Sequence, residues 1–272
     1  MVGWILLSSS AMGNAVAGAL ASGVFRQVPP IEVVALGCVI TGAVLRSCRR
    51  PRIAEWEWDR QRDAALLGSI IVVNAMFLYV AIDRLPLGTA TTAEFLGPLA
   101  LAVAHGGGAR GYLAALAAIV GVAVVSGVDA VFEPIGLCCA FAAGACWAWY
   151  IVVNRRLGRH GSLVESLAGA FAFGGLISLP LAVVALTHVP STEIAALLLA
   201  IALLGRLFPM ACEIFALQRL TTAAASVLFA VVPAAGALSG FALLGQRLSF
   251  VQMIGLATVI GAGLIALRDA AP

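Results

Sequence analysis

Residues 64–104 read AALLGSIIVVNAMFLYVAIDRLPLGTATTAEFLGPLALAVA, and this stretch decides the fold. Two apolar runs flank the turn sequence Leu85-Pro86-Leu87-Gly88, and each run approaches the roughly 20 residues that a helix needs to span a membrane. Its charged residues are Asp83, Arg84 and Glu94 alone. The stretch therefore predicts two membrane-spanning helices joined by a tight turn.

The same pattern extends over the whole chain. Of its 272 residues, 62% are hydrophobic and 11% are charged, whereas a soluble domain has about 45–50% apolar and about 25% charged residues. The apolar runs predict ten helices, near residues 2–24, 30–47, 64–83, 88–105, 110–127, 135–154, 163–186, 194–216, 222–244 and 250–267. This composition excludes a soluble enzyme and an outer-membrane barrel. The predicted fold class is an all-α polytopic membrane protein in a lipid bilayer.

Arginine is distributed unevenly among the predicted connections, and all 16 basic residues are Arg. If both termini face the cytoplasm, twelve arginines lie in cytoplasmic segments, and Arg26, Arg84 and Arg247 lie outside. Cytoplasmic loops carry such an excess, so we expect both termini in the cytoplasm of a cell whose plasma or inner membrane holds the protein. The net charge of +3 gives no indication of nucleic-acid binding, and nothing in the sequence indicates an oligomeric state.

An internal repeat relates the two halves of the chain. Ala81, Arg84, Leu85, Ala90, Pro98 and Ala100 recur 135 positions later as Ala216, Arg219, Leu220, Ala225, Pro233 and Ala235. Residues 1–134 and 135–272 then hold five helices each, and an odd number inverts the second half relative to the first. Inverted repeats of this kind are typical of secondary transporters with a solute site near the membrane midplane.

Three ionisable residues lie inside predicted spans, namely Glu94, Arg206 and Glu213. Each costs at least about 2.5–3.5 kcal/mol in a bilayer, so such residues usually face a cavity or a partner. Arg206 and Glu213 are seven residues apart, which places them on one helix face about 10 Å apart, with Pro209 between them. The alternatives are a buried structural ion pair, or side chains that reach the membrane surface from near a helix end.

Other polar and aromatic residues in the spans are weaker candidates for a solute site. Trp147, Trp149 and Tyr150 are candidates for lining a cavity, although interfacial or packing roles explain them equally well. Asn74 is kept as a candidate, but like Asn14 and Tyr79 it is better explained by an interhelical hydrogen bond. No metal-binding or dinucleotide motif occurs, so no metal or cofactor is expected.

At these residues the chain resembles the EamA family of the drug/metabolite transporter superfamily, and most closely its threonine/homoserine exporter branch. The segments that carry the resemblance include Glu94-Phe95-Leu96-Gly97-Pro98-Leu99-Ala100, Gly144-Ala145-Cys146-Trp147-Ala148-Trp149-Tyr150, Pro209 with Glu213, and Gly245-Gln246-Arg247-Leu248-Ser249. The resemblance covers essentially the whole chain. It implies ten helices in two inverted five-helix repeats, and export of small amino acids or related metabolites.

Three positions depart from the family pattern. Gln246 stands where family members commonly carry Glu, while Ser22 and Gly37 align with a Lys and an Arg of the branch. This chain has Arg206 instead, at a position that the resemblance implies to be small or polar. Either Arg206 binds a substrate carboxylate in place of the missing pair, or the substrate differs.

Three classes of function remain open. The first is a secondary transporter, not an enzyme, that exports small amino acids or related metabolites with proton coupling, and in which Glu94 binds the solute ammonium or the coupling proton. The second is efflux of cationic drugs or other small metabolites. The third is a non-transporting membrane subunit or an intramembrane enzyme, neither of which needs an inverted repeat. Because a site for simple cations gains nothing from a guanidinium, Arg206 favours the first class over the second.

Overall fold

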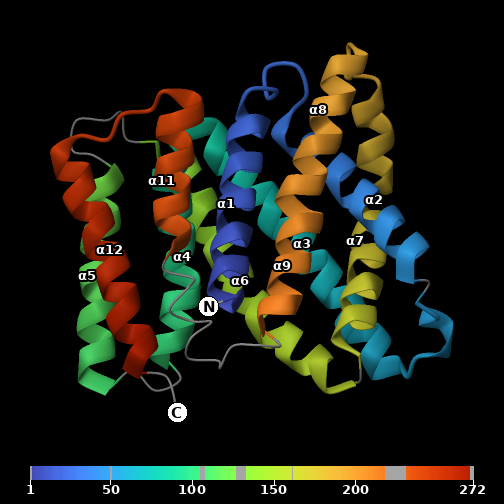
Figure 1. Cartoon of the computed structure of the whole chain (residues 1–272), viewed down its shortest axis with the longest axis horizontal. Helices are drawn as coiled ribbons and strands as arrows, with labels where there is room; N and C mark the ends of the chain where they lie inside the picture. The colour runs from blue at the N-terminus through green and yellow to red at the C-terminus, as the bar shows by residue number, and fades with distance from the viewer. Residues whose placement is uncertain are drawn as a thin grey trace.

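The computed structural model of the protein describes residues 2–49, 51–104, 108–126, 133–160, 162–217 and 231–269. Within these ranges the chain is helical, with short 3₁₀ and π segments and no β-strand. Most helices run between two ends of a bundle, which are the upper end and the lower end in Figure 1. The lower end holds the N-terminal end of α1 (Val2–Ser22) and the C-terminal end of α12 (Phe250–Asp269).

The helices follow the predicted apolar runs. Between α1 and α12 they are α2 (Pro30–Arg49), α3 (Trp58–Arg84), α4 (Leu87–Ala104), α5 (Gly108–Ser126), α6 (Pro134–Leu157), α7 (Leu163–Leu186), α8 (Thr192–Ala202), α9 (Phe208–Leu217) and α11 (Val231–Leu244). In the described part of the chain, six helical stretches are long and apolar enough to cross a membrane, and three shorter helices are also apolar. The prediction of an all-α polytopic membrane protein is confirmed. Of the predicted helix at 222–244, only the part from Val231 onward is described.

Several helix boundaries have identifiable local causes. Leu85 ends α3 in an extended conformation, as expected for the residue before a proline. Glu133 caps α6 by accepting a hydrogen bond from the Gly136 amide, and Pro134 follows at the first helical position. Ser191 caps α8 in the same way, by accepting from the amide of Ile194.

The predicted start of the third helix was wrong by six residues. The helix α3 begins at Trp58 rather than at residue 64, because its polar first two turns are helical although they lack the apolar pattern of a span. Their charged side chains contact the connection between α6 and α7 and the start of α7. The polar residues 58–63 therefore belong to a helix whose side chains make these contacts, and they do not form a loop.

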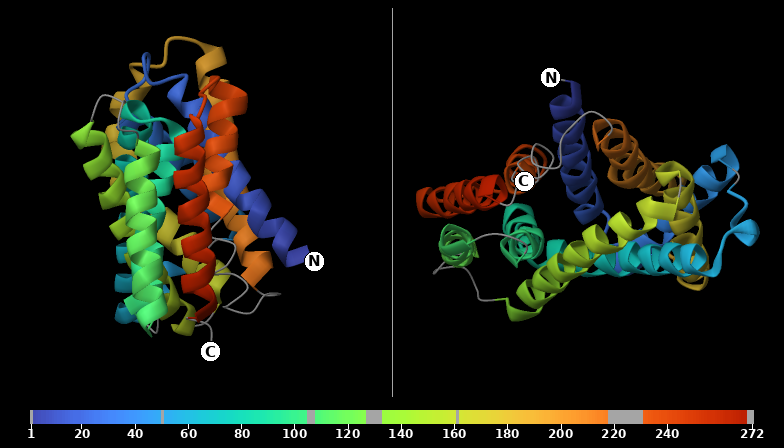
Figure 2. Two further views of the ribbon diagram at one scale, coloured as in Figure 1. Left: turned by 90° about the vertical axis from the view of Figure 1, so that its left-hand side faces the viewer. Right: turned by 90° about the horizontal axis from the view of Figure 1, so that it is seen from below.

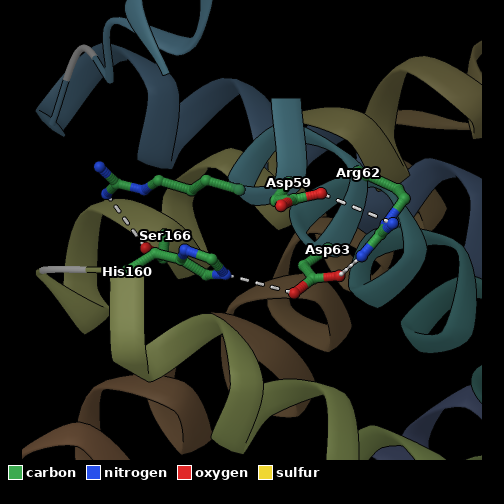
Figure 3. A network of polar contacts seen from close by, with 6 residues as sticks. Asp59, Arg62, Asp63, His160 and Ser166 are labelled. Atoms are coloured by element: carbon green, nitrogen blue, oxygen red, sulfur yellow. Dashed lines mark hydrogen bonds and ion pairs between the residues drawn. The ribbon is translucent and has the colours of Figure 1, made fainter. Parts of the chain in front are cut away.

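The contacts at the start of α3 form a polar group that we call the lower-end network (Figure 3). Its members are Asp59, Arg60, Arg62, Asp63, His160, Glu165 and Ser166. The Asp63 carboxylate lies 3.5 Å from Arg62 Nη2 and 3.4 Å from His160 Nε2. Arg60 donates to Ser166 Oγ at 3.1 Å, and its guanidinium lies 4.0 Å from the centre of the Trp56 ring. The network joins the lower ends of α3, α6 and α7.

The predicted helix at 194–216 was also wrong in one respect, because it is not a continuous α-helix. A π-helical turn, Leu203–Leu207, separates α8 from α9. Pro209 lies two residues beyond the turn and cannot donate to the carbonyl of Gly205, four residues earlier. The loss of that hydrogen bond explains why the regular ladder breaks at this place.

Helices from the two halves of the chain pack against each other throughout the bundle. The main pairs between residues 1–134 and 135–272 are α2 with α7, α5 with α12, α3 with α6, α4 with α6, α3 with α7, α1 with α9, and α4 with α11. Seen from below in Figure 2, α5 and α12 lie at one edge of the bundle and α2 lies toward the other. The helices α1, α3, α4, α6, α9 and α11 lie between these edges, where the functional candidates are found.

Candidate functional site

Glu94 lies near the middle of α4, and its side chain is buried, with 5% of the residue exposed. The helix passes very close to α6 at this level. A Cβ atom on Gly144 of α6 would lie 2.5 Å from the Glu94 carbonyl oxygen and 3.2 Å from the Gly97 nitrogen. Two glycines, Gly97 and Gly144, therefore allow the two backbones to touch, and this contact fixes the position of Glu94 against α6.

The carboxylate of Glu94 is held by an amide from a third helix. Asn74 of α3 donates one hydrogen bond from Nδ2 to Glu94 Oε1 at 3.0 Å and another to the carbonyl oxygen of Ala143 at 2.8 Å. Because both amide hydrogens are used, the orientation of Asn74 is fixed. A single side chain thus connects α3, α4 and α6 around the acid. The prediction of an interhelical hydrogen bond for Asn74 is confirmed.

A cavity of about 210 Å³ lies beside this group. Its walls come from α1, α3, α4, α6, α7, the π turn, α9 and α11. Five of the candidate residues named from the sequence line it, namely Asn74, Glu94, Trp147, Tyr150 and Arg206. Asn74 and Arg206, which are 132 positions apart in the chain, thus lie on the wall of one cavity. A solute site between the two halves of the chain would need residues from both halves in this way.

Another candidate, Glu213, belongs to α9, but its side chain lies outside the described part of the structure. Its predicted placement on the same helix face as Arg206 therefore stays a prediction. Arg206 itself lies in the π turn and is half-buried. Among the described residues, no ion pair with Arg206 is present. The alternative in which Arg206 forms a structural ion pair with Glu213 therefore also stays a prediction.

Aromatic side chains form one part of the cavity wall. Trp147 and Tyr150 of α6 line it, as does Tyr79 of α3, which also packs on Phe25 with ring centres 5.8 Å apart. Trp149, the third aromatic candidate, does not line this cavity, and 56% of it is exposed. The helical repeat of α6 therefore separates two cavity-facing aromatics from one that faces the outer surface of the bundle.

Four polar residues that line the cavity were not among the candidate site residues: Ser10, Asn14, Tyr79 and Thr91. Ser10 and Asn14 are four residues apart on α1, which places them on one helix face. The cavity face of α3 runs through Ile71, Asn74, Leu78 and Ile82, at spacings of three and four, with Tyr79 next to it. Polar residues that share one face of an otherwise apolar helix, such as Ser10 and Asn14 on α1, are the sequence signal that would have identified these lining residues.

The side chains on the cavity wall suit a solute that carries one positive and one negative charge. The cavity offers one carboxylate, one guanidinium, the Asn74 and Asn14 amides and two phenol groups on otherwise apolar walls. Within the described residues, no group of three or more His, Cys, Asp or Glu side chains is placed to hold a metal ion. Ionic and hydrogen-bonding groups that converge in a small apolar cavity are typical of a small-molecule site.

Comparison with known proteins identifies relatives along nearly the whole chain. The EamA-like transporter family matches residues 134–268. The threonine/homoserine exporter RhtA of Salmonella typhimurium (strain SL1344) is 31% identical over 270 residues, covering 96% of this chain and 90% of the relative. RhtA of Escherichia coli (strain K12) is 30% identical over 274 residues, with the same coverage of both chains.

A solved crystal structure has the same fold. The two structures align with a TM-score of 0.64 and 22% sequence identity, over 96% of this chain and 95% of the other. The arrangement of helices described above is therefore one that an experimentally determined protein also adopts over nearly its whole length.

Proposed function

Because the chain belongs to the EamA-like transporter family, we propose that it exports small amino acids, with L-threonine and L-homoserine as the first solutes to test. The observation that carries this proposal is the cavity that has Glu94 and Arg206 on its walls. A zwitterion presents an ammonium to the carboxylate and a carboxylate to the guanidinium. The names of the RhtA relatives supply the class of solute, and the charges of this cavity agree with it.

The size of the cavity favours a small solute over a drug. Its volume of about 210 Å³ is below the roughly 300–1,000 Å³ of pockets that hold drug-sized ligands. A cationic drug would also meet the guanidinium of Arg206, which repels it. The cavity therefore supports amino-acid export rather than efflux of cationic drugs.

We further propose that Glu94 carries the coupling proton as well as the solute ammonium. Its carboxylate is buried in a spanning helix, and its hydrogen-bond partner in the described part of the chain is the neutral Asn74 amide. A buried carboxylate without a cationic partner is costly in a membrane, and either a proton or an ammonium removes that cost. The two therefore compete for one site, which is the simplest way to couple their movements.

Alternating access in this proposal comes from two inverted repeats, residues 1–134 and 135–272. The packing pairs support this division: the repeat equates α3 with the segment α8–α9 and α1 with α6, so the pair α3–α6 has the counterpart α1–α9. The pair α2–α7 is its own counterpart, and so is α5–α12. Rocking of one repeat against the other would expose the cavity first to one side and then to the other.

We propose that the lower end faces the cytoplasm. Of the described arginines in connections and helix ends, Arg52, Arg60, Arg62, Arg155, Arg156 and Arg159 lie in the α2–α3 and α6–α7 regions of that end. Arg26, Arg84 and Arg247 lie in the connections of the upper end. This bias has the sign expected for a cytoplasmic lower end.

Export can be measured in inside-out membrane vesicles that contain the full chain. When the vesicles are acidified inside by respiration, we expect them to accumulate labelled L-threonine or L-homoserine, and a protonophore should abolish the accumulation. Vesicles that carry the Glu193→Gln variant are the matched control, because Glu193 is exposed in the first turn of α8 and away from the cavity. Absence of accumulation for every amino acid, with transport of a cationic dye instead, would contradict the proposal.

A further inference from the structure

The π turn at Leu203–Leu207 places a cationic side chain on the wall of the cavity. Both Gly205 and Arg206 line the cavity, and so does Pro209. A π turn contains one more residue than an α turn and changes the direction in which following side chains point; such turns are frequent at functional sites. Pro209 makes this distortion permanent, because it has no N–H to restore the bond to the Gly205 carbonyl.

Helix α1 packs directly on the turn and supports it. A Cβ atom on Gly205 would lie 2.7 Å from the Ala17 Cβ, and a Cβ on Gly13 would lie 3.0 Å from the Leu204 carbonyl oxygen. Small residues four positions apart on α1 therefore leave room for the widened turn. The turn is held against a neighbouring helix rather than exposed to lipid on all sides.

The Arg206 side chain lies across α2 at a residue without a side chain. A Cβ atom on Gly37 would lie 3.6 Å from Arg206 Nε and 4.0 Å from Arg206 Cδ. A methyl group at this position would thus touch the arginine in ordinary van der Waals contact, and any longer side chain would occupy the space that the guanidinium stem now takes. The absence of a side chain at Gly37 leaves this space beside the Arg206 stem open.

The guanidinium has donors that the described residues leave unused. It has five N–H groups, yet no described acid forms an ion pair with it. The buried acid of the cavity, Glu94, is instead bonded to Asn74. Inserting an arginine into a membrane costs free energy, and the arginines found in membrane-spanning segments usually lie on the path of a solute or an ion.

We propose that Arg206 is the specificity-determining residue that binds the carboxylate of the solute, and that Gly37 is required for its position. This assignment rests on the proposed function in that it takes the cavity as the transport site. The planar guanidinium binds a carboxylate through two parallel hydrogen bonds, a geometry that an ammonium group does not provide. The cavity therefore selects solutes that carry a carboxylate over analogues that lack one.

The first experiment compares solutes that differ only in the carboxylate. Binding to the purified full chain is measured by ligand-induced thermal stabilisation, with L-threonine against L-threoninol and with L-lactate against propane-1,2-diol. We expect the wild type to prefer the carboxylate-bearing member of each pair that it binds by about ten- to a hundredfold, the range for hydrogen bonds to a charged group. Arg206→Gln should abolish this preference, and Arg206→Lys should restore part of it. The control Arg247→Gln changes an exposed arginine outside the cavity and should retain the preference.

A second variant tests the position of the guanidinium without removing its charge. Gly37→Leu fills the space beside the Arg206 stem and should reduce the carboxylate preference as Arg206→Gln does. The control is Gly261→Leu, because a Cβ atom on Gly261 of α12 meets nothing within 4 Å. If Arg206→Gln or Gly37→Leu binds with the wild-type preference, the assignment is wrong.

The same measurements separate this assignment from the proposed function. A wild-type protein that ignores L-threonine but still prefers lactate to propane-1,2-diol contradicts amino-acid export and supports the role of Arg206. A wild-type protein that exports L-threonine and binds L-threoninol equally well contradicts the role of Arg206 and leaves export intact.

Discussion

Asp63 and Glu94 are two acids with the same burial and opposite surroundings. Each is 5% exposed. Asp63 lies at the lower end between Arg62 and His160, at 3.5 and 3.4 Å (Figure 3). Glu94 lies in the middle of the bundle, where Asn74 donates one neutral hydrogen bond to it. Within the described residues, cationic or potentially cationic side chains contact the first acid, and an amide contacts the second.

The difference shows which acid has its charge balanced by the fold. The charge of Asp63 is balanced by Arg62 of its own helix, and the His160 imidazole of the α6–α7 connection also contacts it, so its contacts join the lower ends of those helices. No described side chain forms an ion pair with Glu94, and the role that we propose for this acid leaves its charge to a proton or a cationic group of the solute. Burial alone does not distinguish a structural acid from a functional one, whereas the charge of the partner does.

The largest expected effect is on transport by Glu94→Gln. The glutamine Oε1 can still accept from Asn74, so the fold should be retained with unchanged or higher thermal stability. Loss of one partner of a buried charged contact costs about 3–5 kcal/mol, so export should fall by at least about a hundredfold. The measurement is uptake of labelled L-threonine into inside-out vesicles, with membrane insertion quantified by immunoblot.

The conservative variant Glu94→Asp is the control for this prediction. It keeps a carboxylate at the end of a shorter side chain, and we expect partial export. Normal export by Glu94→Gln would show that the charge of Glu94 is not needed, and the contrast with Asp63 would then disappear.

The next effect concerns the packing that positions Glu94. In Gly144→Ala, the new methyl group would come within 2.5 Å of the Glu94 carbonyl oxygen. Because backbone atoms cannot move aside as a flexible side chain does, α4 and α6 must separate, at a cost of about 1–3 kcal/mol. We expect a lower melting temperature in detergent and slower export.

Gly261→Ala is the matched control for Gly144→Ala, since its methyl group enters open space. Equal melting temperatures for the two variants would contradict the close backbone contact between α4 and α6. A lower melting temperature with normal export would mean that the position of Glu94 tolerates a shift of α4.

Much of the fold was predictable because a membrane requires long apolar helices, and such helices correspond to long apolar runs in the sequence. The ends of helices followed prolines and caps such as Pro86 and Ser191, which act locally. The start of α3 was missed because its first turns are stabilised by contacts with His160 and Ser166, about 100 residues away. Periodicity within a segment carries no information on such contacts.

Part of the candidate site was predictable, because the high free-energy cost of inserting a charged residue into a membrane singled out Glu94 and Arg206. The roles of Gly37 and Gly205 were not, because a glycine in an apolar span has many uses, and only the structure shows what its missing side chain leaves room for. The π turn was equally hidden, although Pro209 marked its vicinity. Whether Glu213 joins the site depends on a side chain outside the described residues.

A smaller effect is expected when the same acid-to-amide change is made at the lower end. Asp63→Asn removes a charge that both Arg62 and His160 contact, and its partners are 58% and 29% exposed. Because solvent screens such pairs, the free energy of unfolding should fall by roughly 1 kcal/mol or less. Export per folded molecule should stay near the wild-type value. Loss of export at normal stability would place Asp63 in the transport cycle and remove the distinction between the two acids.

The smallest effect separates the two partners of Asp63. The Arg62 side chain is 58% exposed and also lies 3.6 Å from Asp59, so Arg62→Gln removes one pair in which both side chains are exposed and one in which only the arginine is exposed. Exposed pairs contribute about 0.2–1 kcal/mol, and Arg62→Gln should change the free energy of unfolding by an amount at the lower end of that range. His160 is 29% exposed and belongs to another part of the chain, so its contact with Asp63 joins α3 to the α6–α7 connection, whereas Arg62 belongs to α3 itself. We therefore expect His160→Gln to destabilise the protein more than Arg62→Gln.

In a double-mutant cycle, Asp63→Asn should couple more strongly to His160→Gln than to Arg62→Gln. The reverse order of coupling would mean that the neighbouring arginine, and not the contact between α3 and the α6–α7 connection, holds the charge of Asp63.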